Sequence, residues 1–193
     1  MTDGTLEKIW TVDDLMALGE DAMIEVIDGE IVEMNPVGML HHLVAGNVYR
    51  IVDGHVVKHK SGYVFMDGLL YLLFKEGKGI KGAQVPDVSF ISHTDMLTGW
   101  DIEKPYPGAP TLAVEVVSPG DDADDLLKRV RNYLKAGTSQ VWVVYPQSKE
   151  VHQYTRDEES FRAYVGDATM QVDALFPDLT LTLSAIFDVP MIG

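Results

Sequence analysis

The chain has 193 residues, of which 46% are hydrophobic and 23% are charged, and it contains no cysteine. This composition is typical of a globular protein, and it excludes a disulfide scaffold, a thiolate nucleophile and a zinc site with cysteine ligands. The formal net charge of −15 argues against a general binder of polyanions, because the surface of such a protein is normally positive.

Length and hydropathy predict one domain, residues 1–193, with a cytoplasmic location. A chain of this length can bury roughly 70% of its unfolded surface in one core. No stretch approaches the roughly 18 apolar residues of a membrane span, so we expect no membrane association. The first eight residues, Met-Thr-Asp-Gly-Thr-Leu-Glu-Lys, lack the basic and apolar regions of a signal peptide.

The N-terminal third of the chain predicts a short helix, a β-hairpin and a long helix. A capping pattern at residues 11–14 predicts a short helix that ends at Gly19. Two apolar runs on either side of Asp28-Gly29 predict a hairpin over residues 23–34. Apolar side chains then recur at helical spacing, so we expect a helix from about His41 to Lys58.

The middle of the chain predicts strands and loops. Strands are expected at residues 63–66 and 69–74, joined at Asp67-Gly68, and at residues 83–91 after a loop rich in glycine and lysine at 75–82. Pro86 cannot donate a ladder hydrogen bond, so it marks an edge, a bulge or the beginning of its strand. The glycines and prolines of residues 92–110 predict an ordered loop.

The C-terminal half predicts a strand, a helix and a strand in that order. Residues 111–118 form a β-branched and aliphatic run that is too short for a helix and ends at a Ser-Pro-Gly turn. A helix from about Asp121 to Gly137 has acids at its beginning and bases further on, as the helix dipole favours. A buried strand at 140–145 completes a βαβ-like unit with a right-handed crossover. A hairpin over 151–165 and a short strand and turn over 175–187 follow.

Glu115 is the residue that does not fit its predicted strand. An ionised carboxylate inside a buried strand costs several kcal/mol unless it is paired, hydrogen-bonded or bound to a metal. Side chains alternate along a strand, so Glu115 shares a face with Ala113 and Val117, and the small Ala113 leaves room beside it. An ion pair with Arg129 is the structural interpretation, and a metal site is the functional one.

Asp87 lies on an earlier predicted strand and offers a second carboxylate. Two carboxylates from neighbouring strands, aimed at the same point, would make an oxygen-ligand site for Mg²⁺ or Mn²⁺. Such an ion polarises a phosphoryl oxygen and lowers the pKa of a bound water. Taken alone, an Asp after Pro86 is a frequent turn residue, so it is the combination with Glu115 that indicates chemistry.

Together these segments resemble the putative restriction endonuclease family within the PD-(D/E)XK nuclease superfamily. The resemblance spans about residues 20–187. It rests on Val85-Pro86-Asp87-Val88, on Glu115 in Leu-Ala-Val-Glu-Val-Val-Ser-Pro, on Tyr133-Leu-Lys-Ala-Gly-Thr, on Val141-Trp-Val-Val-Tyr-Pro, on the hairpin at residues 24–34 and on His41 before the long helix.

The resemblance implies a three-layer α/β core, with a mixed central sheet flanked by helices and an N-terminal β-hairpin. It implies an endonuclease that cleaves DNA phosphodiester bonds with Mg²⁺, or with Mn²⁺ as an alternative. Asp87 and Glu115 would be metal ligands, and the Val116 carbonyl would be a third. Binding to DNA should be weak, local and salt-sensitive in so acidic a protein. A homodimer is expected, because cutting both strands needs two sites and symmetric dimers are the commonest oligomers.

The lysine of the superfamily pattern is missing from its usual place. Val117 stands two residues after Glu115, where the superfamily has that lysine. In this family the lysine lies on the following helix, four residues before Tyr133, and Arg129 is there in this chain. Arginine stabilises phosphate charge but stays protonated, so it cannot act as a base. Lys128 is adjacent, although one helical step rotates a side chain by about 100°.

Three interpretations of this departure stay open. Arg129 acts electrostatically, Lys128 reaches the site from the side, or activity is reduced. Both residues also fit the solvent-facing side of an ordinary charged helix.

Glu30 and His41 are further candidates for the site. Glu30 would join the metal shell if it lies on the site side of its hairpin, with Glu25 and Glu33 as competing choices, or it is a solvated carboxylate. His41 would contact phosphate or water, with His42 as its rival, or it only caps or packs the start of the helix.

The partner of the protein is less well defined by the sequence. Lysines that could contact a phosphate backbone, or simply be solvated, are Lys58, Lys60, Lys75, Lys78 and Lys81. A rival hypothesis is a nuclease-fold protein that has lost catalysis and serves as a binding or assembly module. Arg129 in the lysine position and the net charge of −15 both favour this rival.

Overall fold

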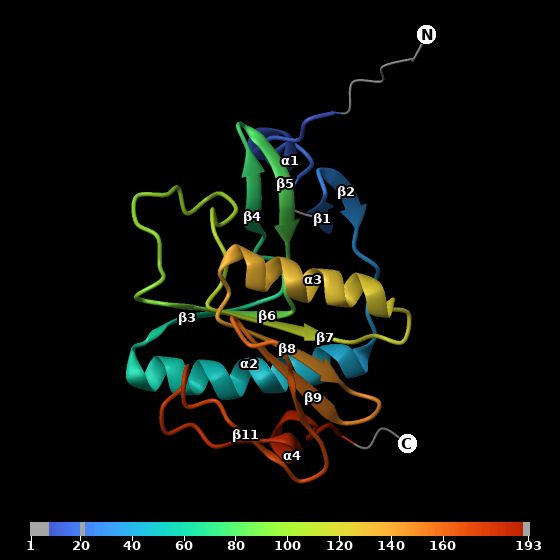
Figure 1. Ribbon diagram of the computed structural model, residues 1–193, viewed down its shortest axis with the longest axis vertical. Coiled ribbons are helices and arrows are strands. Elements are labelled where there is room, and N and C mark those ends of the chain that lie inside the picture. Colours follow the sequence, from blue (N-terminus) through green and yellow to red (C-terminus); the bar gives the residue numbers. More distant parts are fainter. Residues whose placement is uncertain (1–7, 20–21, 191–193) are drawn as a thin grey trace.

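A computed structural model describes residues 8–19 and 22–190 of the chain. A six-stranded sheet lies between helix α2 (Met39–His59) on one face and helix α3 (Ala123–Ala136) on the other, and a four-stranded sheet lies beyond α3 (Figure 1). This mixed, three-layer α/β arrangement with an N-terminal hairpin confirms the fold class predicted from the sequence. Residues 1–7, which carry most of the argument against a signal peptide, lie outside the described ranges.

The six-stranded sheet has the order β10-β9-β8-β7-β6-β3. Its strands are β3 (Gly62–Met66), β6 (Val88–Ser92), β7 (Leu112–Val116), β8 (Gln140–Tyr145), β9 (Glu150–Thr155) and β10 (Arg162–Tyr164). Strands β7 and β8 are parallel and are connected by α3, as the sequence predicted, and the other neighbours are antiparallel. All five residues of β7 are buried, because helices cover both faces of the sheet there.

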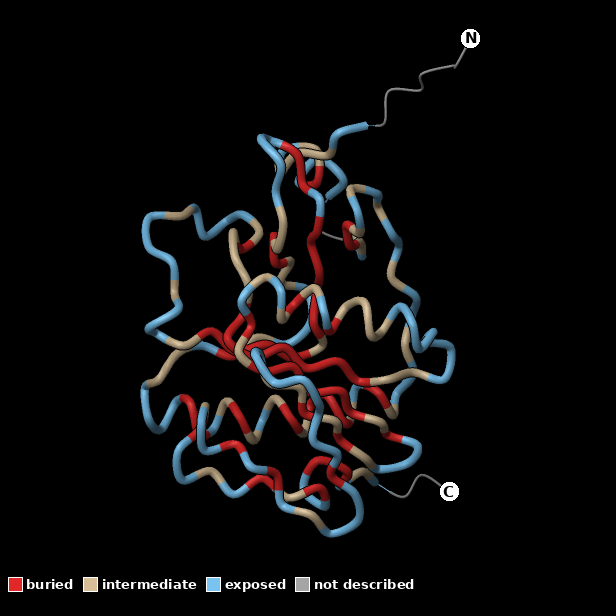
Figure 2. The backbone as a smooth tube through the Cα atoms, in the orientation of Figure 1, coloured by how far each residue is buried: buried red, intermediate tan, exposed pale blue. Residues whose placement is uncertain are grey.

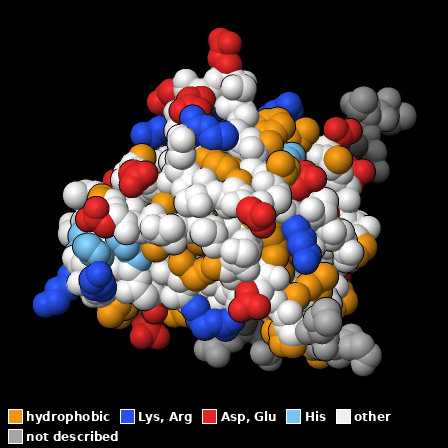
Figure 3. Space-filling model, turned by 90° about the horizontal axis from the view of Figure 1, so that it is seen from below, with side chains coloured by type: hydrophobic (Ala, Val, Ile, Leu, Met, Phe, Trp, Pro, Cys, Tyr) orange, Lys and Arg blue, Asp and Glu red, His pale blue; other side chains and the backbone are white. Residues whose placement is uncertain are grey.

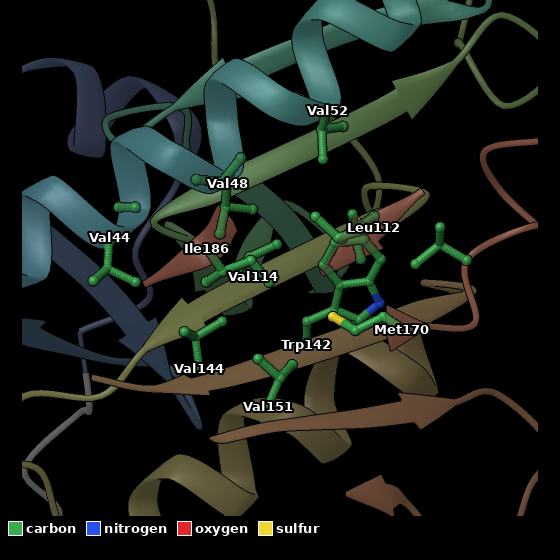
Figure 4. Packing of buried hydrophobic residues seen from close by; sticks show 14 of the residues in the cluster. Val44, Val48, Val52, Leu112, Val114, Trp142, Val144, Val151, Met170 and Ile186 are labelled. Atoms are coloured by element: carbon green, nitrogen blue, oxygen red, sulfur yellow. The ribbon is translucent and has the colours of Figure 1, made fainter. Parts of the chain in front are cut away.

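Helix α2 forms the main core with one face of this sheet. Val44, Val48 and Val52 recur at a spacing of one helical turn and lie in one cluster with Val114 of β7 and Trp142 of β8 (Figure 4). Buried residues concentrate in the six-stranded sheet, whereas the peripheral loops are exposed (Figure 2). No helix in residues 8–19 and 22–190 is long and apolar enough to cross a membrane.

The four-stranded sheet has the order β2-β1-β5-β4, with β1 (Ile24–Ile27), β2 (Glu30–Glu33), β4 (Tyr71–Glu76) and β5 (Gly79–Gln84). The predicted hairpin turn is present, since Asp28 and Gly29 have φ angles of 54° and 90°, as a two-residue turn requires. Helix α1 (Val12–Met16) begins at a capping box between Thr11 and Asp14.

The predicted strand over residues 83–91 is wrong as one continuous element. It is broken between Gln84, the end of β5, and Val88, the start of β6, and these two strands belong to different sheets. Pro86 has no N–H to donate, and the N–H of Val85 is taken by the side chain of Glu25 at 3.0 Å, so neither residue continues a ladder. The chain therefore crosses from one sheet to the other immediately before Asp87.

Other differences from the predicted elements follow from the division of the strands between two sheets. The segments 63–66 and 69–74 are not partners, because β3 and β4 belong to different sheets, and most of the predicted loop at 75–82 forms the β4–β5 hairpin. At the C-terminal end, β11 (Thr169–Met170) pairs with β12 (Leu181–Thr182), and the predicted turn after it is the one-turn helix α4 (Leu183–Ile186).

Candidate active site

Asp87 and Glu115 come together at one end of the six-stranded sheet. Val88 of β6 pairs with Val114 of β7 in antiparallel register, so the next position along each strand places Asp87 opposite Glu115. The Asp87 Oδ2 atom accepts a hydrogen bond of 2.6 Å from the backbone N–H of Val116. This bond fixes the Asp87 carboxylate against the strand that carries Glu115.

His41, in the first turn of α2, holds the other oxygen of Asp87. Its Nε2 lies 2.9 Å from Asp87 Oδ1, and its Nδ1 lies 3.1 Å from the Ser118 hydroxyl. Burial tends to lower the pKa of His41, but the hydrogen bond and negative charge of Asp87 dominate and raise it. The structure thus places His41 in the cluster, whereas its rival His42 is exposed.

Glu115 is buried, with 4% of its surface exposed. Its Oε2 accepts a hydrogen bond of 3.1 Å from Arg129 Nη1, while its Oε1 is buried without a hydrogen-bond partner. Burial raises the pKa of Glu115 to about 8, although the neighbouring Arg129 opposes this shift. The carboxyl group therefore has one oxygen that Arg129 does not hold, with the Tyr133 hydroxyl beside the group.

Arg129 joins Glu115 to a second buried carboxylate, Glu25. The distance from Arg129 Nη2 to Glu25 Oε2 is 2.7 Å, and Glu25 has no exposed surface. Burial raises the pKa of Glu25, and the two carboxylates raise the pKa of Arg129 despite its own burial. Two buried acids thus share one permanent cation, and loss of that cation would leave both acids without a charged partner.

Lys128 and Glu30, two of the residues proposed for the site, lie outside the carboxylate cluster, whereas Arg129 and Glu25 lie within it. Lys128 points to the hairpin turn, where its Nζ lies 2.6 Å from Asp28 Oδ2 in an exposed pair. Glu30 is exposed on β2, the outer strand of its sheet, so it lies apart from the carboxylate cluster. The hairpin glutamate in the cluster is Glu25, on the inner strand β1. Its signal in the sequence is the same as that of Glu115: one acid inside an apolar run.

Two further buried side chains border the cluster. Tyr133 lies one helical turn after Arg129, and burial together with the charge of Glu115 raises its pKa, so its hydroxyl remains protonated. Gln84 follows Ala83, which pairs with Val26, so it lies opposite Glu25. The Tyr133 hydroxyl is buried beside Glu115, and both amide atoms of Gln84 are buried without hydrogen-bond partners, so these are additional polar groups next to the cluster.

A family model described as putative restriction endonuclease (Uma2) matches residues 12–184. The chain belongs to this family. The resemblance inferred from sequence motifs is thereby confirmed, and it places the chain among nucleases. No curated protein matches the chain. A solved structure titled as a putative nuclease belonging to DUF820, from Anabaena variabilis, has a TM-score of 0.76 and 21% identity, covering 92% of this chain and 97% of that chain. That likeness shows a shared fold.

The oxygen atoms of the cluster in this restriction endonuclease family member supply some, but not all, of the ligands that a hard cation needs. Asp87 and the free Oε1 of Glu115 are carboxylate donors. The Val116 carbonyl points to the same side of β7 as its N–H, which bonds to Asp87. Residues 8–19 and 22–190 contain no group of three or more His, Asp or Glu side chains placed to hold a metal. A cation here would therefore need backbone oxygen and water to complete its shell.

The buried glutamate gives this family member an unusual expected dependence of stability on pH. The pKa of Glu115 is raised from 4.5 to about 8, so the folded state binds more protons than the unfolded state between these values. The free energy of unfolding of the protein should therefore fall as the pH rises through this window. Urea unfolding of the wild type and of Glu115→Gln, measured at several pH values across this window, checks the expectation.

The glutamine variant should show a shallower decline of stability with pH than the wild type. Glu159→Gln, which removes one negative charge from an exposed position, is the matched control. Parallel pH profiles for the wild type and Glu115→Gln would contradict the expectation.

Proposed function

We propose that the protein is a DNA endonuclease that hydrolyses phosphodiester bonds with Mg²⁺, or with Mn²⁺ in its place. The observation that carries the proposal is the pairing of Asp87 with Glu115 on adjacent strands, in a chain of a putative restriction endonuclease family. Cutting both strands needs two such sites, so we further propose that the protein acts as a homodimer.

The residues of the cluster have distinct roles in this proposal. Asp87, the free oxygen of Glu115 and the Val116 carbonyl would hold the cation. A divalent cation at such a site polarises a phosphoryl oxygen and lowers the pKa of water. His41 fixes the orientation of Asp87 through one oxygen while the Val116 N–H holds the other. This double constraint keeps the carboxylate in place before a substrate arrives.

Arg129 would supply positive charge at the scissile phosphate. Its guanidinium is permanently protonated, so it orients and neutralises charge but takes no proton from water. Its side chain retains 27% exposure, so it is not fully closed off from solvent. Lys128 is directed to Asp28, so we assign this electrostatic role to Arg129 alone.

A second candidate function is a binding or assembly module that has lost catalysis. Arg129 forms ion pairs with both Glu25 and Glu115, at the position where the family pattern has lysine. The net charge of −15 also disfavours tight binding to DNA. On the face seen in Figure 3, acidic and basic side chains are interspersed and form no continuous basic surface.

Nicking of supercoiled plasmid tests the proposed activity. The wild type should convert the plasmid to the nicked form with Mg²⁺ or Mn²⁺, should fail to do so in EDTA, and should lose activity on Glu115→Gln. Low salt favours the expected weak binding. Intact plasmid under all conditions, or undiminished cutting by Glu115→Gln, would remove the enzymatic proposal. Cutting by Arg129→Lys in the absence of cutting by the wild type would instead favour the second candidate.

A further inference from the structure

An apolar cavity of about 210 Å³ lies beside the proposed active site. It is bordered by α1, by the two ends of the β1–β2 hairpin and by the segment between β3 and β4. Most of its lining is apolar, with Leu15, Met16, Met23, Met34, Leu70 and Val85 among the contributors. Met16 and Met23 are 44% and 52% exposed, so this wall is open to an incoming ligand.

Two lining residues connect the cavity to the carboxylate cluster. The backbone N–H of Asp67 donates a hydrogen bond of 3.0 Å to the backbone carbonyl of Asp87. Val85 lines the cavity and donates its own N–H to Glu25. The negative charge of Asp67 also contributes to the raised pKa of His41. The cavity and the proposed phosphate site are therefore immediate neighbours.

The lining has the chemistry of a site for a flat aromatic ligand. Three methionines offer flexible, polarisable thioethers, which make favourable contacts with aromatic rings. The volume is below the roughly 300–1,000 Å³ of pockets for drug-sized ligands, so it suits a small ring system. Asp67 is the charged member among the described residues that line the cavity.

We propose that this cavity receives the nucleobase next to the cleaved phosphate, and that Asp67 favours a base with an amino group. The inference rests on the proposed nuclease function, since it places a phosphate at Asp87. Enzymes that act on a base hold it out of the stack between aromatic or apolar side chains, and an apolar cavity beside a phosphate site offers the same kind of contact. A carboxylate accepts hydrogen bonds from an amino group such as that of cytosine, whereas thymine presents carbonyl oxygens at the equivalent edge.

Binding of mononucleotides tests the proposal without requiring cleavage. Methionine methyl groups labelled with ¹³C are observed by NMR while deoxycytidine monophosphate, thymidine monophosphate or inorganic phosphate is added to the full chain in the presence of Mg²⁺. The methyl signals of Met16, Met23 and Met34, assigned by single Met→Leu variants, should shift with the nucleotides and not with phosphate alone. Met170, which is 3% exposed in the main core, is the control signal.

The Asp67→Asn variant tests the preference between bases. Deoxycytidine monophosphate should bind the wild type roughly three- to tenfold more tightly than thymidine monophosphate, the range of one hydrogen bond. The asparagine amide donates to thymine carbonyls, so this preference should vanish or reverse. Asp173→Asn, at an exposed aspartate outside the cavity lining, should retain the wild-type preference.

Two results would overturn the inference. Absence of methyl shifts with both nucleotides excludes a base site in the cavity. Equal binding of the two nucleotides by the wild type excludes the role of Asp67. Plasmid nicking without nucleotide-induced shifts would remove this inference and leave the nuclease proposal standing. Shifts without nicking would remove the nuclease proposal and leave only a cavity that binds nucleotides, without a cleaved phosphate beside it.

Discussion

Replacement of Arg129 by alanine should destabilise the fold by about 3–5 kcal/mol, the usual cost of leaving a buried charge without its partner. Arg129 lies 2.7 Å from Glu25 and 3.1 Å from Glu115, and both acids are buried. Without the guanidinium, each acid must either stay charged in an apolar surrounding or take up a proton. Urea unfolding at neutral pH measures the loss.

The neighbouring Lys128 provides the matched control. Its pair with Asp28 is exposed, so Lys128→Ala should cost no more than about 1 kcal/mol. Lower pH should reduce the cost of Arg129→Ala, because protonation then neutralises the two acids. Adding Glu25→Gln to Arg129→Ala should also recover part of the stability. Equal losses for the arginine and lysine variants would refute the structural role assigned to Arg129.

The sequence singled out Glu115 because the physical signal at this residue is local. An acid inside the apolar run of residues 111–118 can be recognised without knowledge of the fold, since burial of an unpaired charge is costly. The same local reasoning predicted the capped helix α1, the Asp28-Gly29 turn and the parallel unit around α3, where pattern and turn residues agree.

The local pattern does not decide between the hairpin glutamates, because Glu33 lies inside an apolar run just as Glu25 does. Glu25, Glu30 and Glu33 all lie on short strands of one hairpin, and the strand that faces the interior depends on a distant pairing. That pairing is β1 with β5, through Val26 and Ala83. It buries Glu25 and leaves Glu30 on the outer strand.

The sequence likewise could not predict which side chain of α3 faces the sheet. A helical step of about 100° shows that Lys128 and Arg129 point in different directions, but not which of them faces the sheet. Packing of Val130 and Tyr133 on the sheet settles the rotation of α3 and turns Arg129 toward Glu115. The position of the buried Tyr133 hydroxyl beside that carboxylate likewise follows from this rotation.

The geometry is also compatible with the proposed phosphate-cleaving site in so acidic a protein. Glu25 and Glu115 carry two negative charges when ionised, and Arg129 compensates one of them. Asp87 is compensated separately, by the Val116 N–H and by His41. A phosphate would therefore be repelled by the cluster unless a cation is added, which gives metal binding an electrostatic purpose in the proposed reaction.

Replacement of Asp87 by asparagine should lower plasmid nicking by about a hundredfold or more, since a catalytic metal contributes several kcal/mol to the transition state. Asparagine has nearly the same shape and keeps an acceptor for the Val116 N–H, so the fold should survive. The charge that holds the cation is lost, so binding of Mn²⁺, followed by its electron paramagnetic resonance signal, should weaken in parallel.

A positioning role for His41 predicts a smaller effect than the loss of Asp87. His41→Gln should reduce nicking by roughly ten- to a hundredfold, because it loosens the orientation of Asp87 and leaves its charge in place. Asp95→Asn is the control for folding, since Asp95 accepts a hydrogen bond from Thr111 at the opposite end of β7. If Asp87→Asn weakened Mn²⁺ binding but cut as fast as the wild type, the cation would be structural and the catalytic centre would have to be sought elsewhere.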